Sequence, residues 1–430
     1  MKVLSLFDGM ACGMLAMQKA GIEAERYVAY EIDKYAVQTS AHNFPMIEQK
    51  GDVFQADFTE YCDFDFLIGG SPCTYWSIAQ KNNRETEASG MGWELFSQYV
   101  RALHEAKPKF FVYENNKSMS KAIRASIDKA FGFEAIGINS ALVSAQNRQR
   151  LYWVGKRNED GSYSKVPVEQ PKDLGILLKD VLESGTAWQD KSFAYTTRCQ
   201  GAIPHDTLGK HRHTMVAEPV RIPAYGVEDK SRPVSASYAH KGSGEGSLAC
   251  DAFPDNPNKQ VFDYVAEPVC MRYERTDEAK AVRKQYEAGE IKHGFHELHE
   301  LHPRTDGKSN TLSTVLKDNP ICEPVPGYAT PCEWDENGKP IKAISVADGK
   351  TYNMYEVKDG LITIKGKQYP IKLPDGFYII RKLTVRECMR LLTVPEWYEF
   401  HVSDSQAYKM LGNGWTVDVI VHLLKGCVSE

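Results

Sequence analysis

Three features are missing from the sequence: paired cysteines, a long apolar run and an excess of basic residues. The ten cysteines include no CxxC pair, so their spacing predicts neither a zinc site nor a disulfide framework. His211 and His213 have no cysteine partners at ligand spacing, and we therefore expect no metal. No apolar run approaches the length of a membrane span, so we expect an intracellular protein that does not insert into a membrane.

The composition is that of an ordinary globular protein. The chain has 430 residues, of which 42% are hydrophobic and 25% charged, and this length predicts two to three domains. The formal net charge of −5 excludes a uniformly basic surface for nucleic acid, but it leaves a local basic cleft open.

The N-terminal part follows the pattern of an α/β fold. Residues 3–17 indicate a buried strand, a turn containing Gly9 and Gly13, and the start of a helix. A second strand ends in Glu31, where such folds place an acid on ribose hydroxyls, and Asp52 is placed to accept from an adenine amino group. Taken alone, this pattern suits any nucleoside or dinucleotide cofactor, a nicotinamide included, and both acids also suit a solvated surface.

A cysteine follows one of the predicted buried strands. Leu67–Ser77 runs from apolar residues through Gly-Gly into a turn that presents Cys73, at the strand end where open α/β sheets bind ligands. Cys73 is a candidate nucleophile, although a lone cysteine in a turn is also compatible with an inert small residue. Glu114 follows the strand predicted at 110–113, so we expect it to share one cleft with Cys73 and to act as a general acid.

Further polar groups flank this predicted cleft. Arg148 and Arg150 alternate before an apolar strand, so they should project from the same face and suit an anion. Residues 74–92 form a polar loop of a length typical of a lid.

The chain changes character between about 158 and 380, where Pro, Gly, Ser, Thr and His accompany short alternating strands. Basic residues gather at 193–242, including Arg198, Arg212 and Arg232. Such residues suit phosphate contacts, and a solvated β surface explains them equally well.

In this order the pieces closely resemble the DNA (cytosine-5) methyltransferases over about 1–157 and 381–430. The matching motifs are Phe7-Asp8-Gly9 with Gly13, Glu31 and Asp52, Pro72-Cys73 with Ser77, Glu114-Asn115, Gln146 with Arg148 and Arg150, Arg381–Leu392, and Gly412-Asn413. Two features depart from the usual pattern. Asn116 stands where the family usually has valine, while Met10-Ala11-Cys12 and Trp415 are more similar to the de novo methyltransferases of animals.

The resemblance implies a Rossmann-like α/β methyltransferase that depends on S-adenosylmethionine and carries a large, mainly β target-recognition insert. The implied domains are 1–157 and 381–430, which together form the catalytic domain, and 158–380, which recognises the target. The implied catalytic residues are Cys73, Glu114, Arg148 and Arg150. The implied cofactor-binding residues are Phe7, Asp8, Gly9, Gly13, Glu31, Ile32, Asp52, Val53, Pro72, Asn413 and Trp415.

The implied reaction is methyl transfer to C5 of a cytosine flipped out of a specific duplex DNA sequence, with Cys73 bonded to C6. Ser77, Gln80, Arg198, Arg212 and Arg232 are the candidate DNA contacts. We expect a monomer in the cytoplasm of a bacterium or a phage-infected cell, and a cognate restriction endonuclease is a candidate partner. An RNA cytosine-5 methyltransferase and a non-catalytic DNA-binding relative remain the alternatives.

Overall fold

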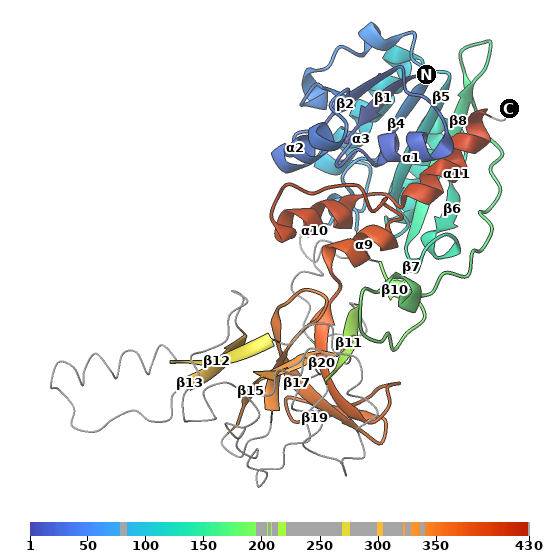
Figure 1. Cartoon of the computed structure of the whole chain (residues 1–430). Helices are drawn as coiled ribbons and strands as arrows, with labels where there is room; N and C mark the ends of the chain where they lie inside the picture. Colours follow the sequence, from blue (N-terminus) through green and yellow to red (C-terminus); the bar gives the residue numbers. More distant parts are fainter. Residues whose placement is uncertain are drawn as a thin grey trace, which may run out of the picture.

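The chain forms a layered α/β lobe and a second lobe built of strands (Figure 1). The structure is a computed structural model, and it describes residues 1–77, 84–194, 204, 208, 214–220, 269–275, 299–303, 321–322, 328–335 and 340–428.

Within these residues, eight strands form the sheet of the first lobe, in the order β3-β2-β1-β4-β5-β8-β6, with β9 paired to β8. Strands β1 to β5 are parallel, and β8 is antiparallel to both of its neighbours β5 and β6. The bounds are β1 Lys2–Leu6, β2 Arg26–Tyr30, β3 Glu48–Gln49, β4 Phe66–Gly69, β5 Phe110–Asn116, β6 Ile136–Asn139, β8 Gln149–Arg157 and β9 Tyr163–Lys165. The strand order reverses between β1 and β4, which is where open sheets of this kind bind ligands.

Helices cover both faces of this sheet, because successive strand residues point to opposite sides. Val3 of β1 packs with the face that α1, α2 and α9 to α11 cover, while Leu4 packs with the face under α3 and α4. The bounds are α1 Cys12–Ala20, α2 Lys34–Asn43, α3 Met91–Ala106, α4 Lys121–Phe131, α9 Val385–Leu391, α10 Asp404–Asn413 and α11 Val417–Val428. Short 3-10 turns lie at Val53–Gln55, Phe58–Tyr61, Cys73–Tyr75, Ser140–Leu142 and Leu178–Val181. None of the helices in the described ranges is long and apolar enough to cross a bilayer.

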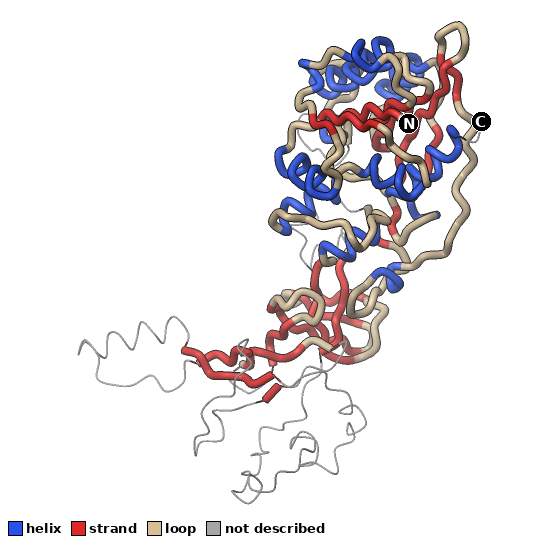
Figure 2. Tube along the Cα trace, turned by 45° about the horizontal axis from the view of Figure 1, so that its top comes forward, coloured by secondary structure: helices blue, strands red, loops and turns tan. Residues whose placement is uncertain are grey.

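Strands make up most of the described part of the second lobe (Figure 2). One sheet has the order β11-β20-β17-β16-β15, with β18 and β19 added at β17, and a smaller sheet has the order β13-β12-β14. The bounds are β11 Met215–Val220, β12 Val269–Arg275, β13 His299–Pro303, β14 Ile321–Cys322, β15 Thr330–Trp334, β16 Pro340–Ile344, β17 Thr351–Lys358, β18 Leu361–Ile364, β19 Lys367–Pro370 and β20 Gly376–Lys382. Asp359 and Gly360 both have positive φ and form the tight turn between β17 and β18.

The chain leaves the first lobe later than residue 158. Strand β9 pairs with β8, and β10 (Ser192–Phe193) pairs in parallel with β7 (Gln146–Asn147). Leu178 belongs to the apolar core of the first lobe. Residues 163–182 and 192–193 therefore lie with the α/β lobe, whereas Thr186 pairs with Ala217 of β11 and Trp188 packs on the core of the second lobe.

A buried arginine joins the two lobes. Arg381, at the end of β20, donates two hydrogen bonds of 2.8 Å to the Glu387 carboxylate on α9 and a third to Glu218 on β11. All three side chains are at most 1% exposed. Thr384 caps α9 and forms a capping box with Glu387, so the Glu387 carboxylate both caps the start of the helix and binds Arg381 at the junction of the lobes.

Candidate active site

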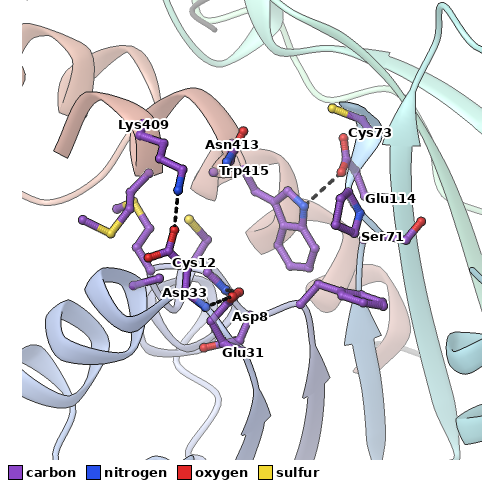
Figure 3. Close-up of a pocket in the computed structure, with 18 of the residues that line it drawn as sticks. Asp8, Cys12, Glu31, Asp33, Ser71, Cys73, Glu114, Lys409, Asn413 and Trp415 are labelled. Carbon is purple, nitrogen blue, oxygen red and sulfur yellow. Dashed lines mark hydrogen bonds and ion pairs between the residues drawn. The ribbon is translucent and has the colours of Figure 1, made fainter. Parts of the chain in front are cut away.

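A cavity of about 440 Å³ lies at the carboxyl ends of β1, β2, β4 and β5 (Figure 3). Segments from both ends of the chain form its walls. It is lined by residues 7–10, 12, 31–33, 36, 70–74, 114, 148, 150, 409, 410 and 413–415. The cavity therefore occupies the reversal point of the strand order, and its volume suits a ligand of nucleoside size.

The turn between β1 and α1 forms one end of the cavity. Phe7 and Gly9 have φ values of +58° and +60°, so the turn is left-handed where the backbone meets the cavity. The backbone N–H of Gly9 donates to Glu31 Oε2 at 2.8 Å, while Oε1 accepts from the backbone of Ile32 and Asp33. Three backbone donors thus fix the Glu31 carboxylate at the end of β2.

Asp8 carries a buried acceptor at this end. Its Oδ1 accepts from Ser5 Oγ at 2.5 Å and from Tyr27 Oη at 2.7 Å, and its Oδ2 has no hydrogen-bond partner among the described residues. Burial raises the pKa of Asp8 to about 6, against the opposing effect of these two hydrogen bonds. Asp8 lines the cavity, and its Oδ2 is a buried acceptor without a partner among the described residues.

The C-terminal part of the chain closes the cavity. Lys409 on α10 contacts Asp33 Oδ2 at 2.6 Å, and this contact holds the pKa of Asp33 below its usual value although burial acts to raise it. Asn413 and Trp415 line the cavity just beyond (Figure 3).

The opposite end of the cavity holds Glu114, which lies within β5 and opposite Tyr152 of β8. Glu114 Oε1 pairs with Arg150 Nε at 2.9 Å, and Oε2 accepts from Trp415 Nε1 at 3.1 Å. A Cβ on Gly70 would lie 2.9 Å from both Glu114 O and Glu114 Oε2. The close approach of β4 and β5 at this point therefore requires glycine.

Cys73 begins the 3-10 turn that follows β4, and it is half-buried on the cavity wall. Its carbonyl accepts from the backbone of Trp76 and Ser77, and from Asn116 Nδ2 at 3.4 Å. Asn116, the departure from the family motif, thus contacts the turn that carries the thiol.

The residues before Cys73 are also fixed by a buried network. Ser71 Oγ and Tyr113 Oη are 2.6 Å apart, and Asn115 Nδ2 donates to the Ser71 carbonyl at 3.1 Å. Tyr113 and Asn115 of β5 therefore hold the strand end before Cys73 in place.

The two arginines have different partners although both line the cavity. Arg150 pairs with Glu114, whereas Arg148 is 3% exposed and donates to the carbonyls of Gly414 at 2.7 Å and Gly412 at 3.4 Å. Burial, together with the nearby Arg150, lowers the pKa of Arg148 to about 10, so it stays cationic at neutral pH. Arg148 thus holds the turn that positions Trp415.

One cavity therefore brings together the Cys73 thiol, the Glu114 carboxyl group, the guanidinium groups of Arg148 and Arg150, and a glycine-containing turn of the kind that binds nucleoside cofactors. The sequence pattern of the C-5 cytosine-specific DNA methylase family matches residues 1–429. The chain belongs to this family. The prediction of a DNA cytosine-5 methyltransferase with a Rossmann-like α/β fold is thereby confirmed.

Relatives of this methyltransferase include phage and bacterial proteins. It is 27% identical over 454 residues to the orphan methyltransferase M.SPRI of Bacillus phage SPR, covering 99% of this chain and 97% of that protein. It is 29% identical over 210 residues to the type II methyltransferase M1.ScrFI of Lactococcus lactis subsp. cremoris, covering 44% of this chain and 51% of that protein. A crystal structure of a Spodoptera frugiperda DNMT2 mutant aligns over 99% of both chains, with 16% identity and a TM-score of 0.47.

Three residues of the methyltransferase that were predicted to bind cofactor do not line the described cavity. A Cβ on Gly13 would lie 2.3 Å from Ile68 Cδ1, so this glycine allows α1 to pack on the sheet. Asp52 caps a 3-10 turn by accepting from Phe54 N at 3.0 Å, and Val53 is buried in the core behind β1. The remaining predicted cofactor residues lie on the cavity wall.

The predicted lid is anchored where the structure describes it. Trp76 is fully buried and donates to Glu85 Oε2 at 3.0 Å, while Arg84 donates to the Ser118 carbonyl at 2.7 Å. Ser77 lies at the near edge of this loop. The other predicted DNA contacts lie outside the described residues: Gln80, Arg198, Arg212 and Arg232.

No role is predicted from the sequence for Asp33, Gly70 and Lys409, which also line the cavity. Asp33 follows a strand end and precedes a helix, a typical N-cap signal that could have located it. Gly70 was recognised as part of a turn, yet its close approach to Glu114 depends on the neighbouring strand. Lys409 has no local signal, since its partner is 376 residues away.

Proposed function

We propose that this methyltransferase transfers a methyl group from S-adenosylmethionine to C5 of a cytosine that is flipped out of a specific duplex DNA sequence. The observation that carries the proposal is one cavity that is lined by Cys73 and Glu114 at one end and, at the other, by Asp8 after β1 and Glu31 after β2. C5 of cytosine is a poor nucleophile, so the reaction needs a group that first adds to C6.

The cavity residues fit S-adenosylmethionine. The unpartnered Oδ2 of Asp8 and the fixed carboxylate of Glu31 offer acceptors for its polar groups, and the exposed Ile32 offers an apolar surface for its base. The further residues that would hold it are Phe7, Gly9, Pro72, Asn413 and Trp415. When bound, the cofactor supplies a methyl group on a sulfonium, which is a good electrophile.

Cys73 and Glu114 would activate the cytosine together. The Cys73 thiolate forms a bond from Sγ to C6, and the electron pair of the C5–C6 double bond becomes available at C5. Glu114, whose carboxyl group lines the same cavity, would donate a proton to N3 of the cytosine as Cys73 adds, and would take it back when Cys73 departs. After methyl transfer the C5 proton leaves to a base, and Cys73 departs as thiolate.

The partners of the arginines assign them separate roles in this proposal. Arg150, already beside Glu114, would donate to O2 of the cytosine as negative charge develops. Arg148 would act by holding the Gly414 carbonyl and hence Trp415 against Glu114. It is therefore a positioning residue.

A Cys73→Ala variant tests the central step. We expect methylation of duplex DNA to be abolished while S-adenosylmethionine still binds, because the thiol lies away from the cofactor turn. Tritiated methyl transfer and calorimetric titration of the cofactor measure the two properties. Appreciable residual methylation would refute the nucleophile assignment.

Two alternative functions are separated by simple experiments. An RNA cytosine-5 methyltransferase would methylate tRNA in preference to duplex DNA in parallel assays, and the large strand-rich second lobe favours the duplex. A non-catalytic DNA-binding relative would give no covalent complex with a duplex containing 5-fluorocytosine. Intact Cys73 and Glu114 favour an enzyme.

The biological setting is also a proposal. From the origins of its relatives we infer that the protein acts in the cytoplasm of a bacterium or a phage-infected cell, and we propose that it acts there as a monomer. The Lactococcus relative is named a type II methyltransferase, which suggests a cognate restriction endonuclease as a partner. The phage relative is named an orphan methyltransferase, which suggests that no such partner exists. Base-resolution methylation sequencing of DNA from expressing cells would give the target sequence, which can then be tested for protection.

A further inference from the structure

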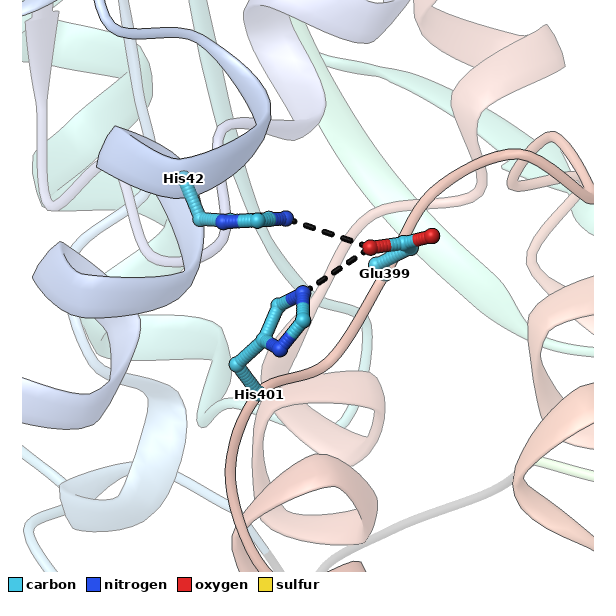
Figure 4. Close-up of side chains that lie close together, drawn as sticks. All are labelled: His42, Glu399 and His401. Carbon is cyan, nitrogen blue, oxygen red and sulfur yellow. Dashed lines mark hydrogen bonds and ion pairs between the residues drawn. The ribbon is translucent and has the colours of Figure 1, made fainter.

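A cluster of metal-ligating side chains lies outside the cavity. His42, in the last turn of α2, and His401, in the segment between α9 and α10, both point at Glu399 (Figure 4). His42 is 357 positions from Glu399, so no local ligand spacing reveals the full cluster. The expectation of no metal rested on such spacing.

The distances within this cluster match a metal site. Glu399 Oε2 lies 3.2 Å from His42 Nε2 and 2.9 Å from His401 Nε2, and one ligand atom from each residue falls within 4.8 Å of the others. A tetrahedral Zn²⁺ with bonds of about 2.0–2.1 Å keeps its ligand atoms about 3.3 Å apart. Small side-chain movements would therefore bring all three atoms into the coordination sphere of one ion.

The backbone that carries these ligands is fixed independently. Asn43 Nδ2 donates to the Glu399 carbonyl at 2.9 Å, and Asn43 Oδ1 accepts from the Glu399 N–H at 3.0 Å. The Phe44 ring packs edge-on against Trp397, with centroids 5.9 Å apart. An ion would thus find its ligands already held side by side, which reduces the entropy lost on binding.

We propose that His42, Glu399 and His401 bind one divalent transition-metal ion of the zinc type at the surface of the first lobe. Two imidazoles and one carboxylate favour Zn²⁺ over Mg²⁺ or Ca²⁺, which prefer oxygen ligands only. The three side chains are 45%, 62% and 51% exposed, so water completes the coordination. The ion replaces the two hydrogen bonds that the imidazoles now share with one carboxylate oxygen.

The ion would clamp two walls of the cavity from outside. Helix α2 begins beside Asp33, which lines the cavity, and the hydroxyl of Tyr398 donates at 2.7 Å to the Met10 carbonyl in the turn after β1. Both ligand-bearing segments therefore lead directly into the cavity wall. The role of the metal ion is to stabilise this wall of the cavity, and none of its three protein ligands contacts the atoms that react with the cytosine.

Titration of the full chain with ZnCl₂ tests the site, with binding followed by calorimetry and the Tm by thermal unfolding. We expect each of the variants His42→Ala, His401→Ala and Glu399→Gln to weaken the binding of one equivalent of Zn²⁺ by more than about tenfold. Zn²⁺ should raise the Tm of the wild type by a few degrees and leave the Tm of these variants unchanged. His104→Ala, which removes an exposed histidine on α3, is the matched control and should behave as the wild type.

Circular dichroism without metal shows whether each variant is folded, and the conservative Glu399→Gln keeps the size of the side chain. Absence of micromolar Zn²⁺ binding in the wild type would overturn the proposal. Retention of the full Zn²⁺ stoichiometry and affinity by any one of the three variants would also overturn it. An equal Tm rise with MgCl₂, abolished by the same substitutions, would overturn the assignment to a transition metal.

Discussion

Replacing Gly70 by alanine adds a single methyl group just after β4, where the chain lies against β5 beside the Glu114 carboxyl group. The new Cβ would lie 2.9 Å from the Glu114 carbonyl and 2.9 Å from Glu114 Oε2, with Trp415 Nε1 at 3.4 Å. An ordinary contact is at least 3.4 Å, so Glu114 must retreat by about half an ångström. The backbone contact makes this movement unavoidable.

The expected consequence is a loss of rate rather than of cofactor binding. A displacement of about 1 Å at reacting groups costs about 100-fold, so we expect the single-turnover methylation rate to fall roughly 10- to 100-fold. Affinity for S-adenosylmethionine should change little, because Glu31 and Asp8 lie at the other end of the cavity. Quenched-flow methylation of a saturating DNA duplex measures the rate, and calorimetry measures the affinity.

Gly137→Ala is the matched control. Its Cβ on β6 would meet Leu151 Cδ2 at 3.8 Å, an ordinary contact, so the rate should stay at the wild-type value. If Gly70→Ala methylates DNA as fast as Gly137→Ala, the reasoning from strand spacing to the position of Glu114 is wrong.

The Arg381→Met variant leaves the carboxylates of Glu218 and Glu387 buried without their cation, so urea denaturation should show a loss of about 3–5 kcal/mol of unfolding free energy. The control variant Arg386→Met removes an exposed ion pair and should lose less than about 1 kcal/mol. Equal losses would contradict the buried junction. Glu114→Gln should lower the single-turnover rate about 100-fold or more at unchanged cofactor affinity, and an unchanged rate would exclude it as proton donor. Burial raises the pKa of Asp8 from 3.8 to about 6, so between these pH values the folded protein binds more protons than the unfolded chain, and the contribution of Asp8 to stability falls as the pH rises. The Asp8→Asn variant should lack this part of the pH dependence of the unfolding free energy in urea denaturation. An unchanged pH dependence would refute the raised pKa.

The sequence predicts the elements around the site well because their signals are local. The apolar runs that precede Glu31 and Cys73 are buried strands, and the predicted parallel arrangement brings Cys73 and Glu114 to one cavity. Strand β5 runs further than the predicted 110–113, because β8 pairs with it as far as Asn116. A partner strand that arrives later in the chain decided this boundary.

The partners of the site residues could not be predicted in the same way. Alternation placed Arg148 and Arg150 on one face, but their separate tasks depend on where residues 412–415 return to the cavity. Gly13 is conformationally ordinary in its helix, and only the position of Ile68 shows why it has no side chain. Such contacts are set by packing between distant segments and leave no periodic trace in the sequence.

The cavity is lined by residues from both ends of the chain, and this has a consequence for biosynthesis. The strands and turns that carry Asp8, Cys73 and Glu114 leave the ribosome long before Lys409 and Trp415, and α11 fills the core beside β1 and α1. A nascent chain therefore exposes an unfinished apolar face and an open pocket throughout translation of the second lobe. Methylation can begin only after release of the C-terminal helices, so truncated translation products would be inert and prone to aggregate.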